Sequence, residues 1–148
     1  MKTLRVYIDT SVVGGCHDEE FQEPSQQLLN MAQRGEIKLI VSELLVTELR
    51  KAPREVRDVL SSVPSGNIET VAISGEATEL QKAYIAADVV GSPHRNDALH
   101  VALATVARAD LIVSWNFKHI VHFDKIRGFN SVNLREGFLS VEIHSPLE

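Results

Sequence analysis

The sequence of 148 residues lacks several features that define whole classes of protein. It contains a single cysteine, Cys16, so an internal disulfide is excluded and a reducing compartment is favoured. No apolar run reaches the length of about 18 residues that a membrane-spanning helix requires. The start, Met-Lys-Thr-Leu-Arg, is not followed by an apolar segment with a cleavage site. We therefore expect a cytoplasmic protein with no membrane partner.

The chain also lacks an excess of positive charge. Its 15 Lys and Arg residues stand against 20 Asp and Glu residues, which gives a formal net charge of −5. Such a balance normally argues against a nucleic-acid partner, but the argument weakens if a metal ion neutralises several acids. With 44% hydrophobic residues and no repeat or linker, residues 1–148 are expected to form one domain with its own core.

Apolar periodicity alternates between the spacing of strands and the spacing of helices along the chain. Strands are predicted at 4–9, 38–41, 68–73, 110–116 and 140–145, and helices at 24–35, 42–52, 54–63, 75–90 and 94–107. We interpret the segment around Gly14-Gly15 and Asp18-Glu19-Glu20 as a solvated loop, and residues 117–128 as irregular or helical. The alternation predicts a three-layer α/β/α sandwich around a mainly parallel central sheet.

The first of four unusual polar positions is Asp9, at the carboxyl end of the first strand. Ligands bind at that edge of an open α/β sheet, so a carboxylate there is a candidate for chemistry. The alternative is that Asp9 only caps the following turn. The second position, Glu48, falls on the apolar side of its helix, one turn from Leu44 and Leu45. Its alternative is an ordinary salt bridge, for example to Arg50.

The third position, Asp97, lies in the polar first turn of the most apolar helix. Asn96 or Asp97 could simply cap that helix, and His100 is interpreted as a hydrogen-bonded core histidine rather than a metal ligand. The fourth position, Asn116, ends the fourth strand two residues after Ser114, much as Asp9 ends the first.

In a parallel sheet these four positions can converge at one edge. Three carboxylates about 4 Å apart repel one another by about 4 kcal/mol per pair at an effective dielectric constant near 20, so such a cluster requires a cation. A set of oxygen ligands favours Mg²⁺ or Mn²⁺ over zinc.

Four short motifs, in their order and spacing, resemble those of PIN-domain ribonucleases, in particular the VapC-type toxins of bacterial toxin–antitoxin pairs. The motifs are Ile8-Asp9-Thr10-Ser11, the Leu-Val-Thr-Glu-Leu helix that contains Glu48, the run Asn96-Asp97-Ala98-Leu99-His100, and Ser114-Trp115-Asn116. The resemblance covers essentially the whole chain. Asn116 stands where the family often has an Asp, and His119 stands near the place where some members have a further acid.

The resemblance implies Mg²⁺- or Mn²⁺-dependent cleavage of single-stranded RNA, a homodimer, and inhibition by a cognate antitoxin protein. The metal ligands would be Asp9, Glu48, Asp97 and Asn116. The hydroxyls of Thr10, Ser11 and Ser114 would position water or phosphate. RNA affinity would come from two cationic clusters, Arg50, Lys51, Arg54 and Arg57 in the first and Lys118, Lys125 and Arg127 in the second; the alternative for these charges is a solvated surface.

Two other functions fit parts of the pattern. A receiver-like phosphoacceptor module also clusters acids at strand ends, but the third strand here ends Ala72-Ile73-Ser74 and supplies none of its expected residues. A catalytically weak PIN-like module that binds RNA or a partner protein is the stronger alternative, because Asn116 adds no charge to the site.

Overall fold

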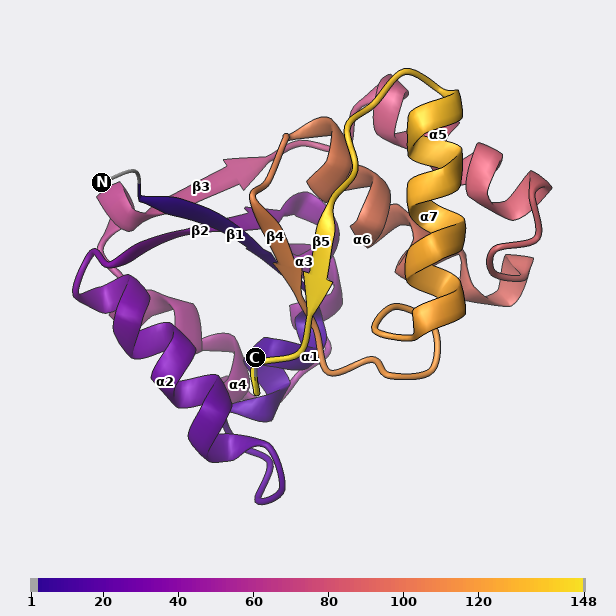
Figure 1. The fold of residues 1–148 in the computed structure, drawn as a ribbon. Helices are drawn as coiled ribbons and strands as arrows, with labels where there is room; N and C mark the ends of the chain where they lie inside the picture. Colours follow the sequence, from indigo (N-terminus) through magenta and orange to yellow (C-terminus); the bar gives the residue numbers. More distant parts are fainter. Residues whose placement is uncertain (1–2, 148) are drawn as a thin grey trace.

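The computed structural model describes residues 3–147, and a five-stranded sheet forms its centre. The strands are β1 (Leu4–Ile8), β2 (Ile37–Ser42), β3 (Ile68–Val71), β4 (Leu111–Val113) and β5 (Glu142–His144). Their order is β3-β2-β1-β4-β5, and all four pairings are parallel. The predicted mainly parallel sheet is confirmed, with the last strand at an edge as expected (Figure 1).

Helices cover both faces of this sheet, so the predicted α/β/α sandwich is also confirmed (Figure 1). The α-helices are α1 (Thr10–Gly15), α2 (Gln22–Gln33), α3 (Glu43–Leu49), α4 (Arg54–Arg57), α5 (Gly75–Ala86), α6 (Arg95–Val106) and α7 (Phe123–Arg135). Short 3-10 helices occur at η1 (Val59–Ser62), η2 (Ser65–Asn67) and η3 (Ser92–His94).

Alternate residues of the strands feed two separate hydrophobic cores. Tyr7 and Ile40 face the layer of α5, α6 and α7, where they pack with the almost wholly apolar α6. Val6 and Ile8 face the opposite layer and pack with residues of α1 and α2. A strand with both faces buried in this way is typical of parallel sheets.

The register of β1 and β4 determines which polar residues meet at the edge of the sheet. Ile8 lies opposite Val113, so Asp9 and Ser114, the next residues of each chain segment, become neighbours. β4 is shorter than the predicted strand 110–116 because serine hydroxyls take over the backbone N–H groups that follow it. Trp115 N donates to Ser11 Oγ and Asn116 N donates to Ser114 Oγ, both at 2.9 Å.

The interpretation of the segment after Asp9 as a solvated loop is wrong for its first part. Residues Thr10–Gly15 form α1, in which Val12, Val13 and Gly15 are buried. The two valines supply enough apolar surface to hold this single turn and a half against the core despite the glycine pair. Cys16, which follows, is buried, and burial raises the pKa of its thiol to about 11.

Several predicted segments also differ in extent from the observed helices. The helix predicted at 54–63 is divided into α4 and η1, and the helix predicted at 75–90 ends at Ala86, before Asp88 with its φ of 60°. α7 extends to Arg135, well beyond the segment interpreted as irregular or helical, because Phe129 and Val132 are buried one turn apart.

No helix within residues 3–147 combines the length and the apolar character needed to cross a membrane.

Candidate metal centre

Asp9 is a buried carboxylate held by two serines. Asp9 is only 4% exposed. It is the residue that precedes α1, but its side chain makes no hydrogen bond that caps this helix, so the capping alternative is wrong. Ser11 Oγ donates to Asp9 Oδ1 and Ser114 Oγ donates to Asp9 Oδ2, both at 2.6 Å. Since both hydroxyls already accept a backbone N–H, their own protons are directed at the carboxylate.

The electrostatic environment of Asp9 disfavours its charge. Burial raises the pKa of Asp9 above its ordinary value, and the positive field of His100 and the two serine hydroxyls only partly offset this effect. The negative charge of Asp97 raises it further. No ion pair found within residues 3–147 includes Asp9, so no cationic side chain in this part of the chain directly contacts the buried carboxylate.

Glu48 lies in α3, next to α1, the helix that follows Asp9. Thr10 Oγ1 donates to Glu48 Oε1 at 2.6 Å, and His100 Nε2 lies 2.7 Å from the same oxygen. Burial acts to raise the pKa of Glu48, but the hydrogen bonds from His100 and Thr10 outweigh it and lower the pKa. The alternative of a salt bridge to Arg50 is therefore wrong, and Oε2 makes no hydrogen bond within the described residues.

A series of buried polar side chains is hydrogen-bonded to Glu48 through His100. His100 is 3% exposed, and its Nδ1 lies 2.7 Å from the Tyr7 hydroxyl, which in turn lies 2.9 Å from Ser42 Oγ. Ser42 also accepts from Leu45 N as the N-cap of α3. The prediction that His100 is a hydrogen-bonded core histidine is confirmed. Tyr7 and Ser42 lie within apolar strand patterns, and nothing in the sequence indicates that they belong to this hydrogen-bonded series.

Asp97 is the third residue of α6 and reaches the same edge of the sheet from the other layer. The residue before α6 is His94, so neither Asn96 nor Asp97 is the N-cap and the capping alternative is wrong. The Asp97 side chain is 27% exposed, and its Oδ2 lies 3.8 Å from His94 Nδ1. Its influence on the pKa of Asp9 shows that the two carboxylates interact.

Asn116 is connected to this group through the backbone. Its N–H donates to Ser114 Oγ, the hydroxyl that binds Asp9, and its own Oδ1 accepts from His119 N at 2.9 Å. The amide therefore closes the turn that follows β4, and one lone pair of Oδ1 is already used.

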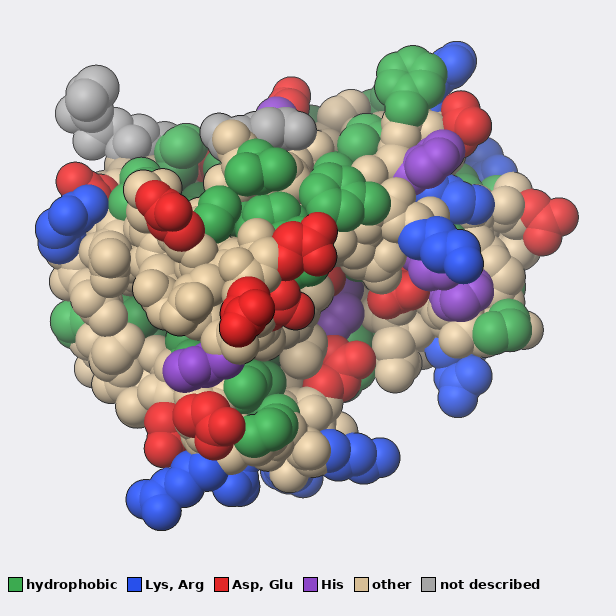
Figure 2. All heavy atoms as spheres, turned by 90° about the horizontal axis from the view of Figure 1, so that it is seen from below, with side chains coloured by type: hydrophobic (Ala, Val, Ile, Leu, Met, Phe, Trp, Pro, Cys, Tyr) green, Lys and Arg blue, Asp and Glu red, His purple; other side chains and the backbone are tan. Residues whose placement is uncertain are grey.

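The three acids share one edge but do not form a closed cluster. Within the described residues, Asp9, Glu48 and Asp97 do not make a group whose ligand atoms all lie within 4.8 Å of one another. The close approach of three carboxylates considered from the sequence is therefore not observed, and each carboxylate has its own set of neighbours. Figure 2 shows a face on which Asp and Glu side chains gather around a hollow that also contains a His side chain, with Lys and Arg side chains toward the rims.

The cationic residues differ in how far they are available to a ligand. Lys125 Nζ donates to Val89 O at 2.7 Å, and Arg54 lies 3.5 Å from Asp58, so both have partners within the protein. Arg54 is nevertheless exposed, as are Arg50, Lys51, Arg57, Lys118 and Arg127.

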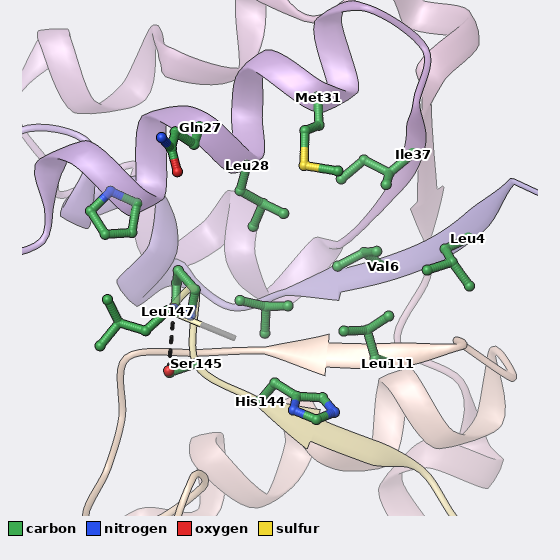
Figure 3. Close-up of a pocket in the computed structure, with 13 residues that line it drawn as sticks. Leu4, Val6, Gln27, Leu28, Met31, Ile37, Leu111, His144, Ser145 and Leu147 are labelled. Carbon is green, nitrogen blue, oxygen red and sulfur yellow. Dashed lines mark hydrogen bonds between the residues drawn. The ribbon is translucent and has the colours of Figure 1, made fainter.

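An apolar cavity of about 380 Å³ lies elsewhere, between α2 and the strands β1 and β4 (Figure 3). Leu28, Met31 and Leu111 contribute to its lining, and no carboxylate side chain among residues 3–147 does. The cavity therefore offers no ligand set for a hard cation.

Comparison with known proteins agrees with this architecture. A family model described as PIN domain matches residues 5–118, the part of the chain that carries all four polar positions. No match was found among curated proteins.

Three solved structures share the fold at low sequence identity. VapBC2 from Rickettsia felis, bound to a DNA fragment from its promoter, has a TM-score of 0.58 at 12% identity and covers 96% of this chain and 98% of its own. VapC20 from Mycobacterium tuberculosis, a toxin that cleaves the sarcin–ricin loop, gives 0.59 at 11% identity, with 92% and 98% covered. DNA-bound VapBC from Salmonella typhimurium gives 0.57 at 15% identity, with 97% and 99% covered.

Proposed function

This chain belongs to the PIN-domain family, and we propose that it is a Mg²⁺- or Mn²⁺-dependent endoribonuclease that hydrolyses phosphodiester bonds of single-stranded RNA. The observation that carries the proposal is the buried Asp9 carboxylate, which no cationic side chain contacts within the described residues. The next residue, Thr10, donates to Glu48, and the charge of Asp97 acts on Asp9. A buried carboxylate without a cation is costly, and a divalent ion would remove that cost.

The donor atoms at this edge fit a hard cation. Asp9, Glu48 and Asp97 offer carboxylate oxygens, and Asn116 offers an amide oxygen with one lone pair left. We propose these four residues as the ligand set, direct or through water. When bound, the ion would neutralise the carboxylates, activate water and offset the charge that develops on the scissile phosphate.

The hydroxyls of Thr10, Ser11 and Ser114 have a supporting role in this proposal. Their protons are donated to Glu48 and Asp9, so we assign them to hold the carboxylates in position rather than to contact phosphate. Glu48 Oε2 is directed by the bonds that Oε1 makes to Thr10 and His100, and it remains available to hold an attacking water.

RNA would be held by the exposed cations near the acidic edge. Arg50 and Lys51 follow α3, which carries Glu48, and Lys118 follows Asn116. These charges would attract the phosphate backbone of a single strand in an otherwise acidic chain.

We further propose that the protein is the toxin of a toxin–antitoxin pair, with a homodimeric form and a cognate antitoxin protein. The structural similarity to a cleaving toxin and to two VapBC structures supports this reading. A short reading frame immediately upstream should encode a protein that copurifies with this chain and inhibits it. Failure of any upstream product to bind would contradict the pairing and leave the nuclease assignment intact.

The nuclease assignment is tested with Asp9→Asn and Asp97→Asn. Each change removes one proposed ligand charge at nearly constant shape. Each should therefore reduce cleavage of a single-stranded RNA oligonucleotide by at least about two orders of magnitude while the circular dichroism spectrum is unchanged. Glu20→Gln removes an exposed charge that belongs to none of the four proposed ligand positions and is the matched control, with unchanged cleavage.

A folded Asp9→Asn or Asp97→Asn variant that cleaves at the wild-type rate would show that the residue is not a ligand. RNA binding without any metal-dependent cleavage by the wild-type protein would instead support the binding-module alternative.

A further inference from the structure

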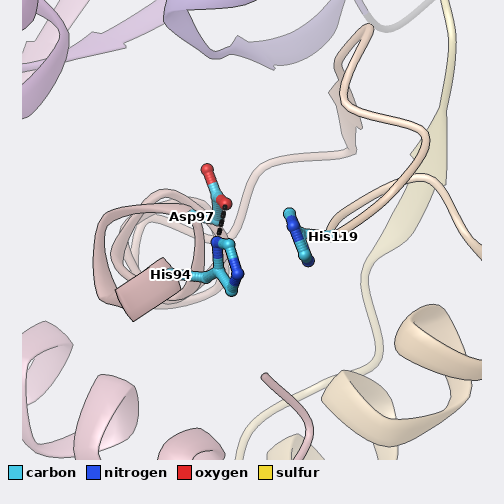
Figure 4. A group of neighbouring side chains, drawn as sticks. All are labelled: His94, Asp97 and His119. Carbon is cyan, nitrogen blue, oxygen red and sulfur yellow. Dashed lines mark ion pairs between the residues drawn. The ribbon is translucent and has the colours of Figure 1, made fainter. Parts of the chain in front are cut away.

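Two histidines and a carboxylate form a second group beside the acidic edge (Figure 4). His94 lies immediately before α6, Asp97 lies in its first turn, and His119 comes from the segment between β4 and α7. One ligand atom of each lies within 4.8 Å of those of the other two. The imidazole rings are stacked, with centroids 3.6 Å apart and planes 24° apart.

This arrangement is not needed for any structural hydrogen bond. The His94 side chain makes no capping bond to α6, and its Nδ1 is 3.8 Å from Asp97 Oδ2, too far for a hydrogen bond. Neither imidazole donates or accepts a hydrogen bond within residues 3–147. The hydrogen bond from His119 to Asn116 Oδ1 is made by the backbone N–H of His119. The ring nitrogens therefore have lone pairs or protons that no hydrogen bond among the described residues uses.

The backbone on both sides of the group is nevertheless fixed. Asn116 Oδ1 accepts from His119 N at 2.9 Å and holds the turn after β4. Gln81 Nε2 donates to Arg95 O at 2.7 Å and ties the start of α6 to α5. The two imidazoles are thus presented from anchored segments, which reduces the entropy lost when a ligand orders them.

We propose that His94, Asp97 and His119 form a second cation site, selective for a borderline transition ion such as Zn²⁺ or Co²⁺. Two imidazole nitrogens and one carboxylate oxygen suit such ions and suit Mg²⁺ poorly. Zinc–nitrogen bonds are about 2.0–2.1 Å long, so the ligand atoms must draw closer than they lie here. Coordination in the ring planes requires one imidazole to rotate, and the partial exposure of both rings leaves room for that.

The proposed histidine site and the proposed Mg²⁺ site have one ligand in common, Asp97. Their other ligands are different residues. Binding of a transition ion is a property of the histidine pair and does not depend on RNA cleavage. Because Asp97 interacts with Asp9 and also lies next to His94, an ion on the histidines would stand next to the acidic edge.

The experiment is a titration of the metal-free, tag-free full chain with Co²⁺, followed by visible absorption, and with Zn²⁺, followed by calorimetry. We expect one tightly bound ion whose affinity falls at least about tenfold in His94→Ala and in His119→Ala. His17→Ala removes an exposed histidine elsewhere and should bind as the wild type does. Asp9→Asn should also retain the ion, because it alters only the oxygen site.

Several results would overturn the proposal. The first is that both histidine variants fold and bind the ion as tightly as the wild type does. The second is that the wild-type chain binds neither Co²⁺ nor Zn²⁺, and the third is that equimolar Mg²⁺ displaces half of the bound Co²⁺. Loss of the ion in Asp9→Asn with retention in the histidine variants would place it at the acidic edge instead. The two variants change residues on separate segments, so failure of one to fold leaves the other as the test.

Discussion

At the scale of single residues, Asp9 combines burial with the absence of a cationic partner in the described structure. Folding raises its pKa above the unfolded value of about 3.9, so the folded state holds the proton more tightly than the unfolded chain does. The contribution of this residue to stability is therefore complete below about pH 4 and is lost as the pH rises through the folded pKa. At pH 7, which is above the unfolded value, the raised pKa makes Asp9 destabilising in the metal-free protein.

Asp9→Asn should consequently stabilise the metal-free protein at pH 7. The amide keeps one oxygen for a serine hydroxyl and removes the buried charge, for a net gain on the order of 1 kcal/mol. Thermal unfolding in EDTA measures this, and the gain should shrink toward pH 4. Added Mg²⁺ should raise the melting temperature of the wild type more than that of the variant. A lower melting temperature for Asp9→Asn in EDTA would show that Asp9 serves the fold.

Substitutions of Asn116 test whether this residue contributes to metal binding. Asn116→Asp adds a charge to the site and keeps an oxygen for His119 N, so Mn²⁺ binding measured by calorimetry should tighten, with cleavage equal or higher. Asn116→Ala removes both the oxygen and the turn closure, and should weaken binding and cleavage. Unchanged metal affinity in both variants would exclude Asn116 from the site.

At the scale of elements, the edge of the sheet is held together by polar bonds between layers. The chain from Glu48 through His100 and Tyr7 to Ser42 connects α3, α6, β1 and β2 without an unsatisfied buried side-chain atom among the described residues. Satisfied networks of this kind fix a single arrangement of the elements that they join.

α1 offers a test of how closely the elements pack around Asp9. A Cβ at Gly15 would lie 2.5 Å from Ser25 Oγ and 2.8 Å from Trp115 Nε1, whereas a Cβ at Gly14 would meet nothing within 4 Å. Gly15→Ala should separate the bonded Trp115–Ser25 pair and destabilise the protein by about 1–3 kcal/mol. Gly14→Ala should be neutral or stabilising by up to about 1 kcal/mol.

Denaturant titration of the two glycine variants provides the comparison. Equal stabilities would mean that α1 is not packed against the Trp115 loop as described.

The elements also show why sequence reasoning succeeded and where it failed. Alternating apolar residues predict β1 and a short apolar run predicts β2, and the helix start and stop signals between the strands predict their order along the chain. α1 was missed because six residues with two glycines carry little local helical signal. The stacking of His94 on His119 depends on a turn closed by Asn116, a contact between distant segments that no local pattern encodes.

At the scale of the whole molecule, the positions of three acidic residues could be predicted from the sequence, but their bonding partners could not. In the sequence, Asp9 stands out at a strand end, Glu48 on an apolar helix face and Asp97 in the polar first turn of the most apolar helix. The structure places all three on elements that meet at one sheet edge. Their individual bonding partners could not be predicted, because serine, threonine and histidine side chains from separate segments provide them. The metal-ligand roles remain predictions that rest on this placement.

The most direct test of the central claim is RNA cleavage by rigorously chelated protein with Mg²⁺ or Mn²⁺ added back. The acidic edge is proposed to act only through a bound divalent ion, so EDTA should abolish cleavage of a single-stranded RNA. Excess Mg²⁺ or Mn²⁺ should restore it in the wild type but not in Asp9→Asn. Full cleavage after rigorous chelation would contradict the account.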